Sequence, residues 1–101
     1  MRVIVFFDLP VGTSAQRRSY NQFRRMLVKE GFLMMQESMY TKLALNATVA
    51  NAIMERVRDN KPPQGLIQML TVTERQFAKM ELVLGEYRTE IIDDERRLVI
   101  L

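Results

Sequence analysis

The chain has 101 residues, of which 48% are hydrophobic, enough for one small core and too few for a second domain. It contains no Cys, His or Trp, which excludes disulfides, a thiolate nucleophile, a Cys or His zinc site and an imidazole general base. A hydrolytic site must therefore use oxygen ligands, which suit a hard cation such as Mg²⁺. Because small domains often complete their burial by pairing, we expect a two-fold homodimer.

The net charge of +3 is spread unevenly. Residues 1–31 carry six basic side chains against two acidic ones, whereas residues 86–95 carry five acidic side chains against one basic one. The apolar run at 3–7 is too short for a signal peptide, and no stretch approaches the roughly 20 apolar residues of a membrane span. We expect a soluble, cytoplasmic protein without membrane contacts.

The first expected elements are a strand and a helix. Residues 3–7 form a β-branched and aromatic run, which predicts a central strand covered on both faces. Thr13 and Gln16 match a capping box that begins a helix over residues 14–30, and Gly31 supplies a left-handed stop. Helical spacing places one apolar stripe on this helix (Gln16, Tyr20, Phe23, Leu27) and a basic arc on its other side (Arg17, Arg18, Asn21, Arg24, Arg25).

The remaining expected elements complete a β-α-β-β-α-β order. Residues 32–35 and 39–45 predict a tight antiparallel pair. Asn46 begins a helix over 47–60, in which Val49, Ile53 and Val57 repeat every four residues, with Ala50 and Met54 beside them. Residues 66–72 form the last strand of the set, followed by a short turn at 73–77 and an apolar stretch at 80–84. This order predicts an α+β, ferredoxin-like split βαβ sandwich, an antiparallel sheet backed by two helices.

We divide the chain into a ferredoxin-like domain, 1–84, and an acidic loop with a C-terminal strand, 85–101. Four terminal apolar residues cannot form a stable element alone, so they must pair with a sheet edge in their own subunit or in a neighbour. The expected partner contacts are Leu98, Val99, Ile100 and Leu101.

Two features can carry chemistry, and each has a structural alternative. The basic arc is either a solvated helix face or a surface for a phosphate backbone, and the lack of acidic residues between 16 and 29 favours the second. Asp8 is either a turn residue or a metal ligand, and a ligand role needs a second carboxylate, such as Asp8 of a homodimer partner. Ser38 is either an ordinary turn residue or a group that positions phosphate. Tyr20 and Tyr40 fit core or interface positions, and the methionines fit core positions.

Four segments together resemble one family: RVIVFFDLP, RRSYNQFRRMLVKEGF, MMQESMYTKL and LTVTERQFAKM. The chain resembles the Cas-two family of CRISPR-associated proteins, in its shorter type II-like form. The resemblance implies a ferredoxin-like homodimer active in spacer acquisition and antiviral defence, and a Mg²⁺-dependent endonuclease of RNA or DNA whose metal-binding, catalytic residue corresponds to Asp8.

The resemblance also implies partners. Family members sit between two dimers of the Cas-one integrase and support the duplex DNA that becomes a new spacer. Arg17, Arg18, Arg24 and Arg25 would then contact the DNA backbone, with Asn21 among them, and residues 98–101 would contact the integrase or the partner subunit. Three functions stay open: a metal-dependent phosphodiesterase, a non-catalytic DNA-binding scaffold, and, at fold level, a small regulatory domain.

Overall fold

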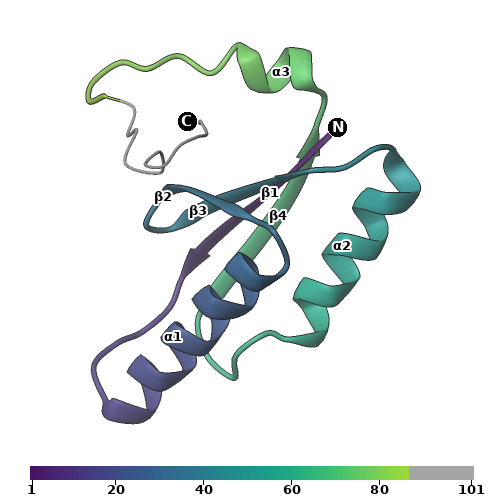
Figure 1. Ribbon diagram of the computed structural model, residues 1–101. Helices are drawn as coiled ribbons and strands as arrows, with labels where there is room; N and C mark the ends of the chain where they lie inside the picture. The colour runs from purple at the N-terminus through teal and green to yellow at the C-terminus, as the bar shows by residue number, and fades with distance from the viewer. Residues whose placement is uncertain (87–101) are drawn as a thin grey trace, which may run out of the picture.

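The computed structural model describes residues 1–86, which form one four-stranded sheet and three helices. The elements in chain order are β1 (Arg2–Asp8), α1 (Ser14–Lys29), β2 (Leu33–Gln36), β3 (Met39–Leu43), α2 (Ala47–Asp59), β4 (Leu66–Val72) and α3 (Glu74–Ala78). The strand order is β2-β3-β1-β4, and all three neighbouring pairs are antiparallel. Helices α1 and α2 lie together along one side of the sheet (Figure 1), which confirms the α+β, ferredoxin-like prediction.

Local signals set both ends of α1. The Thr13 hydroxyl accepts a hydrogen bond from the Gln16 backbone N–H at 3.1 Å, and Gln16 Oε1 accepts one from the Thr13 N–H at 3.0 Å. At the other end, Gly31 has φ of +97°, and the Phe32 N–H donates to the Leu27 carbonyl at 2.9 Å. This pattern is a Schellman motif, so the predicted helix limits are confirmed to within one residue.

The core lies between the sheet and the two long helices. Alternate residues of β1 (Val3, Val5 and Phe7) point toward the helices, as the two-residue period of a strand requires. They pack against a set of fully or nearly buried side chains from the other elements: Phe23, Leu27, Phe32, Tyr40, Ala50, Ile53 and Val57. Tyr40 is therefore confirmed as a core residue, while Tyr20 is half-buried at the edge of this cluster.

Several predicted details are wrong. Helices α1 and α2 cover only one face of β1, and the other face is covered only in part, since Ile4 is buried whereas Phe6 is 37% exposed. Strand β3 ends at Leu43, two residues earlier than expected, and Val49 is exposed because the buried stripe of α2 runs through Ala50, Ile53 and Val57. The expected turn at 73–77 is the short helix α3.

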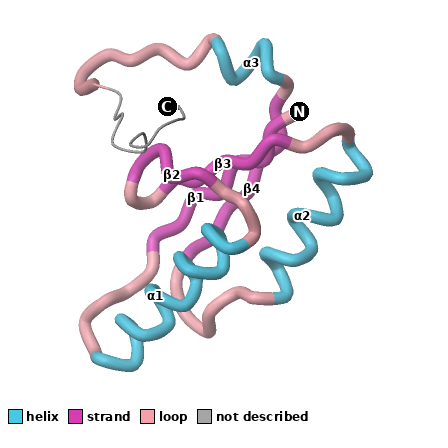
Figure 2. Tube along the Cα trace, in the orientation of Figure 1, coloured by secondary structure: helices cyan, strands magenta, loops and turns pink. Residues whose placement is uncertain are grey.

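Arg2 holds α3 against the face of the sheet that α1 and α2 leave open. Its guanidinium forms a two-point ion pair with Glu74, with N···O distances of 2.7 and 3.0 Å, and lies 4.2 Å from the ring centroid of Phe77. Figure 2 shows the result, with α3 on the opposite side of the sheet from α1. The segment 80–86 continues from α3 without regular secondary structure.

Two predictions fall on residues that the structure does not describe. The terminal strand at 98–101 and nearly all of the acidic loop lie beyond residue 86, so the domain division at residue 85 stays a prediction. Within residues 1–86, none of the helices combines the length and the apolar composition needed to cross a bilayer.

Candidate functional site

Asp8 lies at the end of the central strand β1, on the face of the sheet away from α1 and α2. The alternation along β1 turns Val5 and Phe7 into the core, so Phe6 and Asp8 project from the opposite face. In the register with β4, Asp8 stands directly across from Leu66. The carboxylate is exposed and is placed by regular sheet geometry rather than by a flexible loop.

The open face that carries Asp8 is largely apolar. Phe6 is 37% exposed on β1, and the β4 residues Leu66 and Leu70, across from Asp8 and Ile4, are each about half exposed. Contiguous exposed apolar area of this kind marks an interaction surface on a small protein. Asp8 therefore sits at the margin of a surface suited to burial against another molecule.

The described residues of one chain do not form a metal site by themselves. Among residues 1–86, no three His, Cys, Asp or Glu side chains come close enough together to hold an ion. Magnesium in proteins is commonly held by one or two carboxylates, with waters and substrate phosphates completing its six ligands. Asp8 fits that pattern as one ligand, and a second copy of the chain would supply another.

The backbone around Asp8 is fixed from two sides. The Phe7 N–H donates to the Ser38 carbonyl at 3.0 Å, so the exposed turn that contains Ser38 lies next to the end of β1. On the other side, Gly65 has φ of +112°, and a Cβ there would lie 3.0 Å from the Asp8 carbonyl oxygen and 2.5 Å from Leu9 Cδ2. Gly65 is a positioning residue that the sequence interpretation missed, although its place just before a strand, after two prolines, is a turn signal.

Two of the four α1 arginines bind their own chain. Arg24 Nε donates to the hydroxyl of the buried Tyr40 at 3.0 Å, and this hydrogen bond raises the pKa of the Arg24 guanidinium. Arg17 donates to the backbone carbonyls of Val11 and Gly12, at 3.1 and 3.4 Å. These contacts hold the β1–α1 loop and the flank of α1 in place.

Arg18 and Arg25 are the outermost basic groups of α1. Both are exposed, and within residues 1–86 neither forms an ion pair or a side-chain hydrogen bond. They lie two helical turns apart, about 10 Å along the axis, on the side directly opposite the buried stripe, and Asn21 lies exposed between them and Arg17. Together with the exposed Lys29 at the end of α1, they present positive charge that a phosphate backbone can reach.

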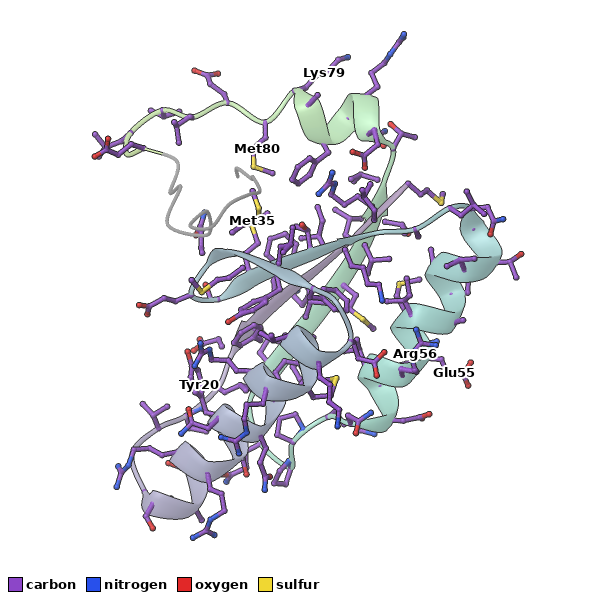
Figure 3. All side chains as sticks on the ribbon, in the orientation of Figure 1. Tyr20, Met35, Glu55, Arg56, Lys79 and Met80 are labelled. Atoms are coloured by element: carbon purple, nitrogen blue, oxygen red, sulfur yellow. The ribbon has the colours of Figure 1, made fainter. Side chains whose placement is uncertain are left out.

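A cavity beside the open face has four methionines among its lining residues. A cavity of about 630 Å³ separates β2 and β3 from the segment 80–86, and Met34, Met35, Met39 and Met80 line it. Figure 3 shows Met35 and Met80 pointing toward one another from its two sides. Met39 is buried, but Met34, Met35 and Met80 are not, so the prediction that the methionines are core residues is wrong for these three. It holds for Met26, Met54 and Met69, which pack against the core.

Comparisons with known proteins agree on one family. Residues 1–80 match the family model described as CRISPR associated protein Cas2. A Treponema denticola protein named CRISPR-associated endoribonuclease Cas2 is 54% identical over 101 residues, covering the whole of both chains. A Streptococcus mutans (strain UA159) protein of the same name is 46% identical over the whole of this chain and 93% of its own length.

A solved structure supports the fold. The crystal structure of Streptococcus pyogenes Cas2 at pH 6.5 superposes with a TM-score of 0.62, at 20% identity, over 84% of this chain and all of that one. The similarity in sequence over the full length confirms the resemblance found in the four sequence segments. The chain belongs to the Cas2 family of CRISPR-associated proteins.

Proposed function

We propose that this chain is a homodimeric nuclease subunit of CRISPR spacer acquisition, with a Mg²⁺ centre built from the Asp8 carboxylates of both copies. The observation that carries this proposal is the placement of Asp8 on the open, apolar face of the sheet, next to Phe6 and across from Leu66. The relatives named endoribonucleases support the nuclease activity.

Packing two open faces together accounts for the dimer and for the site at once. The half-exposed Phe6, Leu66 and Leu70 become buried, which provides the driving force. Because Asp8 projects from the same face of a central strand, a two-fold axis near the end of β1 brings both carboxylates together. Two such carboxylates repel one another unless a cation or a proton lies between them, which favours metal binding.

Within that site the chain's own groups have separate roles. The two Asp8 carboxylates would hold a Mg²⁺ ion, and the chemistry that such an ion would supply is polarisation of a phosphoryl oxygen. Gly65 and the Ser38 carbonyl keep the end of β1 in place. Arg18 and Arg25 bind phosphates of the nucleic acid and so orient its backbone.

A second candidate function is a non-catalytic scaffold. Two facts favour this alternative: within residues 1–86 no three His, Cys, Asp or Glu side chains come close enough to hold an ion, and the sequence has no His to act as general base. In that role the dimer separates two Cas-one integrase dimers and holds the prespacer duplex through Arg18 and Arg25.

Asp8→Asn separates the two functions because it removes the charge and keeps the shape. If the Asp8 pair is catalytic, Mg²⁺-dependent cleavage of RNA or DNA should fall at least 100-fold, with dimer mass and free energy of unfolding unchanged. Asp59→Asn, at the exposed end of α2, is the matched control. Cleavage by Asp8→Asn at the rate of Asp59→Asn refutes the catalytic site. Spacer acquisition that survives Asp8→Asn supports the scaffold, and its loss from an intact complex argues against it.

Duplex binding has its own test. Replacing both Arg18 and Arg25 by Gln should weaken duplex binding and lower the slope of log K against log salt concentration by about 2, since each phosphate contact contributes about 1. The double variant Arg58→Gln with Arg75→Gln removes the same charge from exposed positions on α2 and α3, and its slope should stay near that of the wild type. Equal slopes for the two double variants would exclude α1 as the DNA surface.

A further inference from the structure

We propose that the groove between α1 and the loop joining α2 to β4 binds one unpaired nucleotide of a single-stranded nucleic acid. This inference rests on the proposed nuclease function and specifies the form of its substrate. The groove contains a cavity of about 320 Å³, which lies at the lower end of the range for small-ligand pockets, about 300–1,000 Å³. Its main lining residues are Pro10, Gln16, Ser19, Tyr20, Pro63 and Gln64.

The lining residues suit both the flat faces of a nucleobase and its hydrogen-bonding edges. Unpaired bases are recognised by stacking on aromatic rings and by hydrogen bonds to their edges. Tyr20, whose position on α1 is labelled in Figure 3, contributes a half-buried aromatic ring, and the two prolines add flat apolar surface. Ser19 and Gln64 contribute a hydroxyl and an amide, and no acidic side chain lines the cavity.

A fixed hydrogen-bond chain sets the orientation of the Gln64 amide. Gln16 Oε1 accepts from the backbone N–H groups of Gly12 and Thr13, at 2.9 and 3.0 Å, so its amide nitrogen is turned outward as a donor. That nitrogen donates to Gln64 Oε1 at 3.1 Å. The Gln64 oxygen is thereby occupied, and its NH₂ group remains available to donate to an acceptor on a base edge.

The groove lies at the same end of the sheet as Asp8. Leu9 and Pro10 follow Asp8 directly, while Gln64 precedes Leu66 by two residues, and Asp8 and Leu66 are paired across β1 and β4. Both walls of the cavity therefore continue from the pair of strands that positions the carboxylate. The groove borders α1, whereas Asp8 projects from the opposite face of the sheet, so the end of β1 separates the two.

A neighbouring hollow extends the groove and adds a positive charge. This second cavity, of about 340 Å³, shares Ser19, Pro62 and Pro63 with the surroundings of the first and also includes Lys61. A lysine beside an otherwise neutral polar groove suits the phosphate that follows a bound base. A base inside a duplex is stacked on both sides and cannot offer its face to Tyr20, so the groove selects unpaired strands.

The test uses a short single-stranded oligonucleotide carrying the fluorescent base 2-aminopurine. Because the chain has no Trp, the probe signal is free of protein background. Binding is measured on Asp8→Asn protein in EDTA, so no cleavage interferes. We expect saturable quenching, and a roughly 5- to 150-fold loss of affinity when Ser19→Met fills the groove, as for loss of one stacked base. Gln64→Ala should weaken binding without adding bulk to the helix.

Ser14→Met, on the exposed first turn of α1 and outside both cavities, is the matched control and should bind as the parent does. Equal affinity of Ser14→Met and Ser19→Met, with Gln64→Ala also unchanged, overturns the groove, as does a duplex that competes as well as a single strand. The test is run with RNA and with DNA. Tighter binding of either single strand than of the duplex supports the proposed groove site. Failure of cleavage by the wild type, with probe binding intact, refutes only the proposed catalytic function.

Discussion

Substituting Gly65 by Ala tests whether the corner that carries Asp8 depends on close backbone packing. A side chain at φ of +112° costs about 1–2 kcal/mol in backbone strain. The new Cβ would also lie 2.5 Å from Leu9 Cδ2 and 3.0 Å from the Asp8 carbonyl oxygen, and overpacking of this kind costs about 1–3 kcal/mol. We therefore expect a loss of about 2–5 kcal/mol, a large share of the 5–15 kcal/mol typical of a domain.

The variant Gly31→Ala separates the cost of backbone strain from the cost of overpacking. Gly31 also has a positive φ, +97°, but a Cβ there would meet only the flexible end of Lys42, 3.3 Å from Nζ. Urea unfolding of both variants should show Gly65→Ala to be less stable than Gly31→Ala by about 1–3 kcal/mol, the packing cost alone. Equal losses, or a loss below about 1 kcal/mol for Gly65→Ala, would refute close packing against Asp8.

Two further predictions concern side-chain contacts. The hydrogen bond and ion pair with Arg2 on β1 lower the pKa of Glu74 below its ordinary value of 4.5. The stabilisation from this contact is therefore present above pH 4.5 and is lost as the pH falls through the lowered pKa of Glu74. Glu74→Gln should remove this part of the acid dependence of unfolding, and an unchanged pH profile would contradict the ion pair. Tyr40→Phe should cost about 1.5–3 kcal/mol because Arg24 loses its acceptor, and a smaller loss in urea unfolding would show that this hydrogen bond is weak.

The fold was predictable because its main signals are local. The pair Thr13 and Gln16 begins α1, Gly31 ends it, and the apolar stripe through Phe23 and Leu27 is the one that the structure buries. The same Thr-x-x-Gln capping box recurs at Thr73 and Gln76, where it begins α3. The sequence interpretation applied the signal to the long helix and not to the short one, because a five-residue helix offers little periodicity to support it.

Contacts between distant residues were the part that the sequence could not indicate. The ion pair of Arg2 with Glu74 joins residues 72 positions apart, and it turns α3 over one end of the open face. The sequence interpretation likewise grouped four arginines as equivalent, since helical spacing alone places them on one arc. Only the folded structure shows that Arg24 donates a hydrogen bond to Tyr40, which lies on a different element.

The open face links these observations into one argument about Asp8. An exposed carboxylate at the end of a strand would ordinarily be a solvated turn residue, and within residues 1–86 Asp8 belongs to no cluster of three potential metal ligands. Its neighbours on that face are apolar, however. Burying them against another molecule is favourable only if the carboxylate stays hydrated or gains a partner of opposite charge. If a homodimer that buries Phe6 and Leu66 pairs Asp8 with a cation, dimerisation should tighten when Mg²⁺ is added, and Asp8→Asn should remove that dependence.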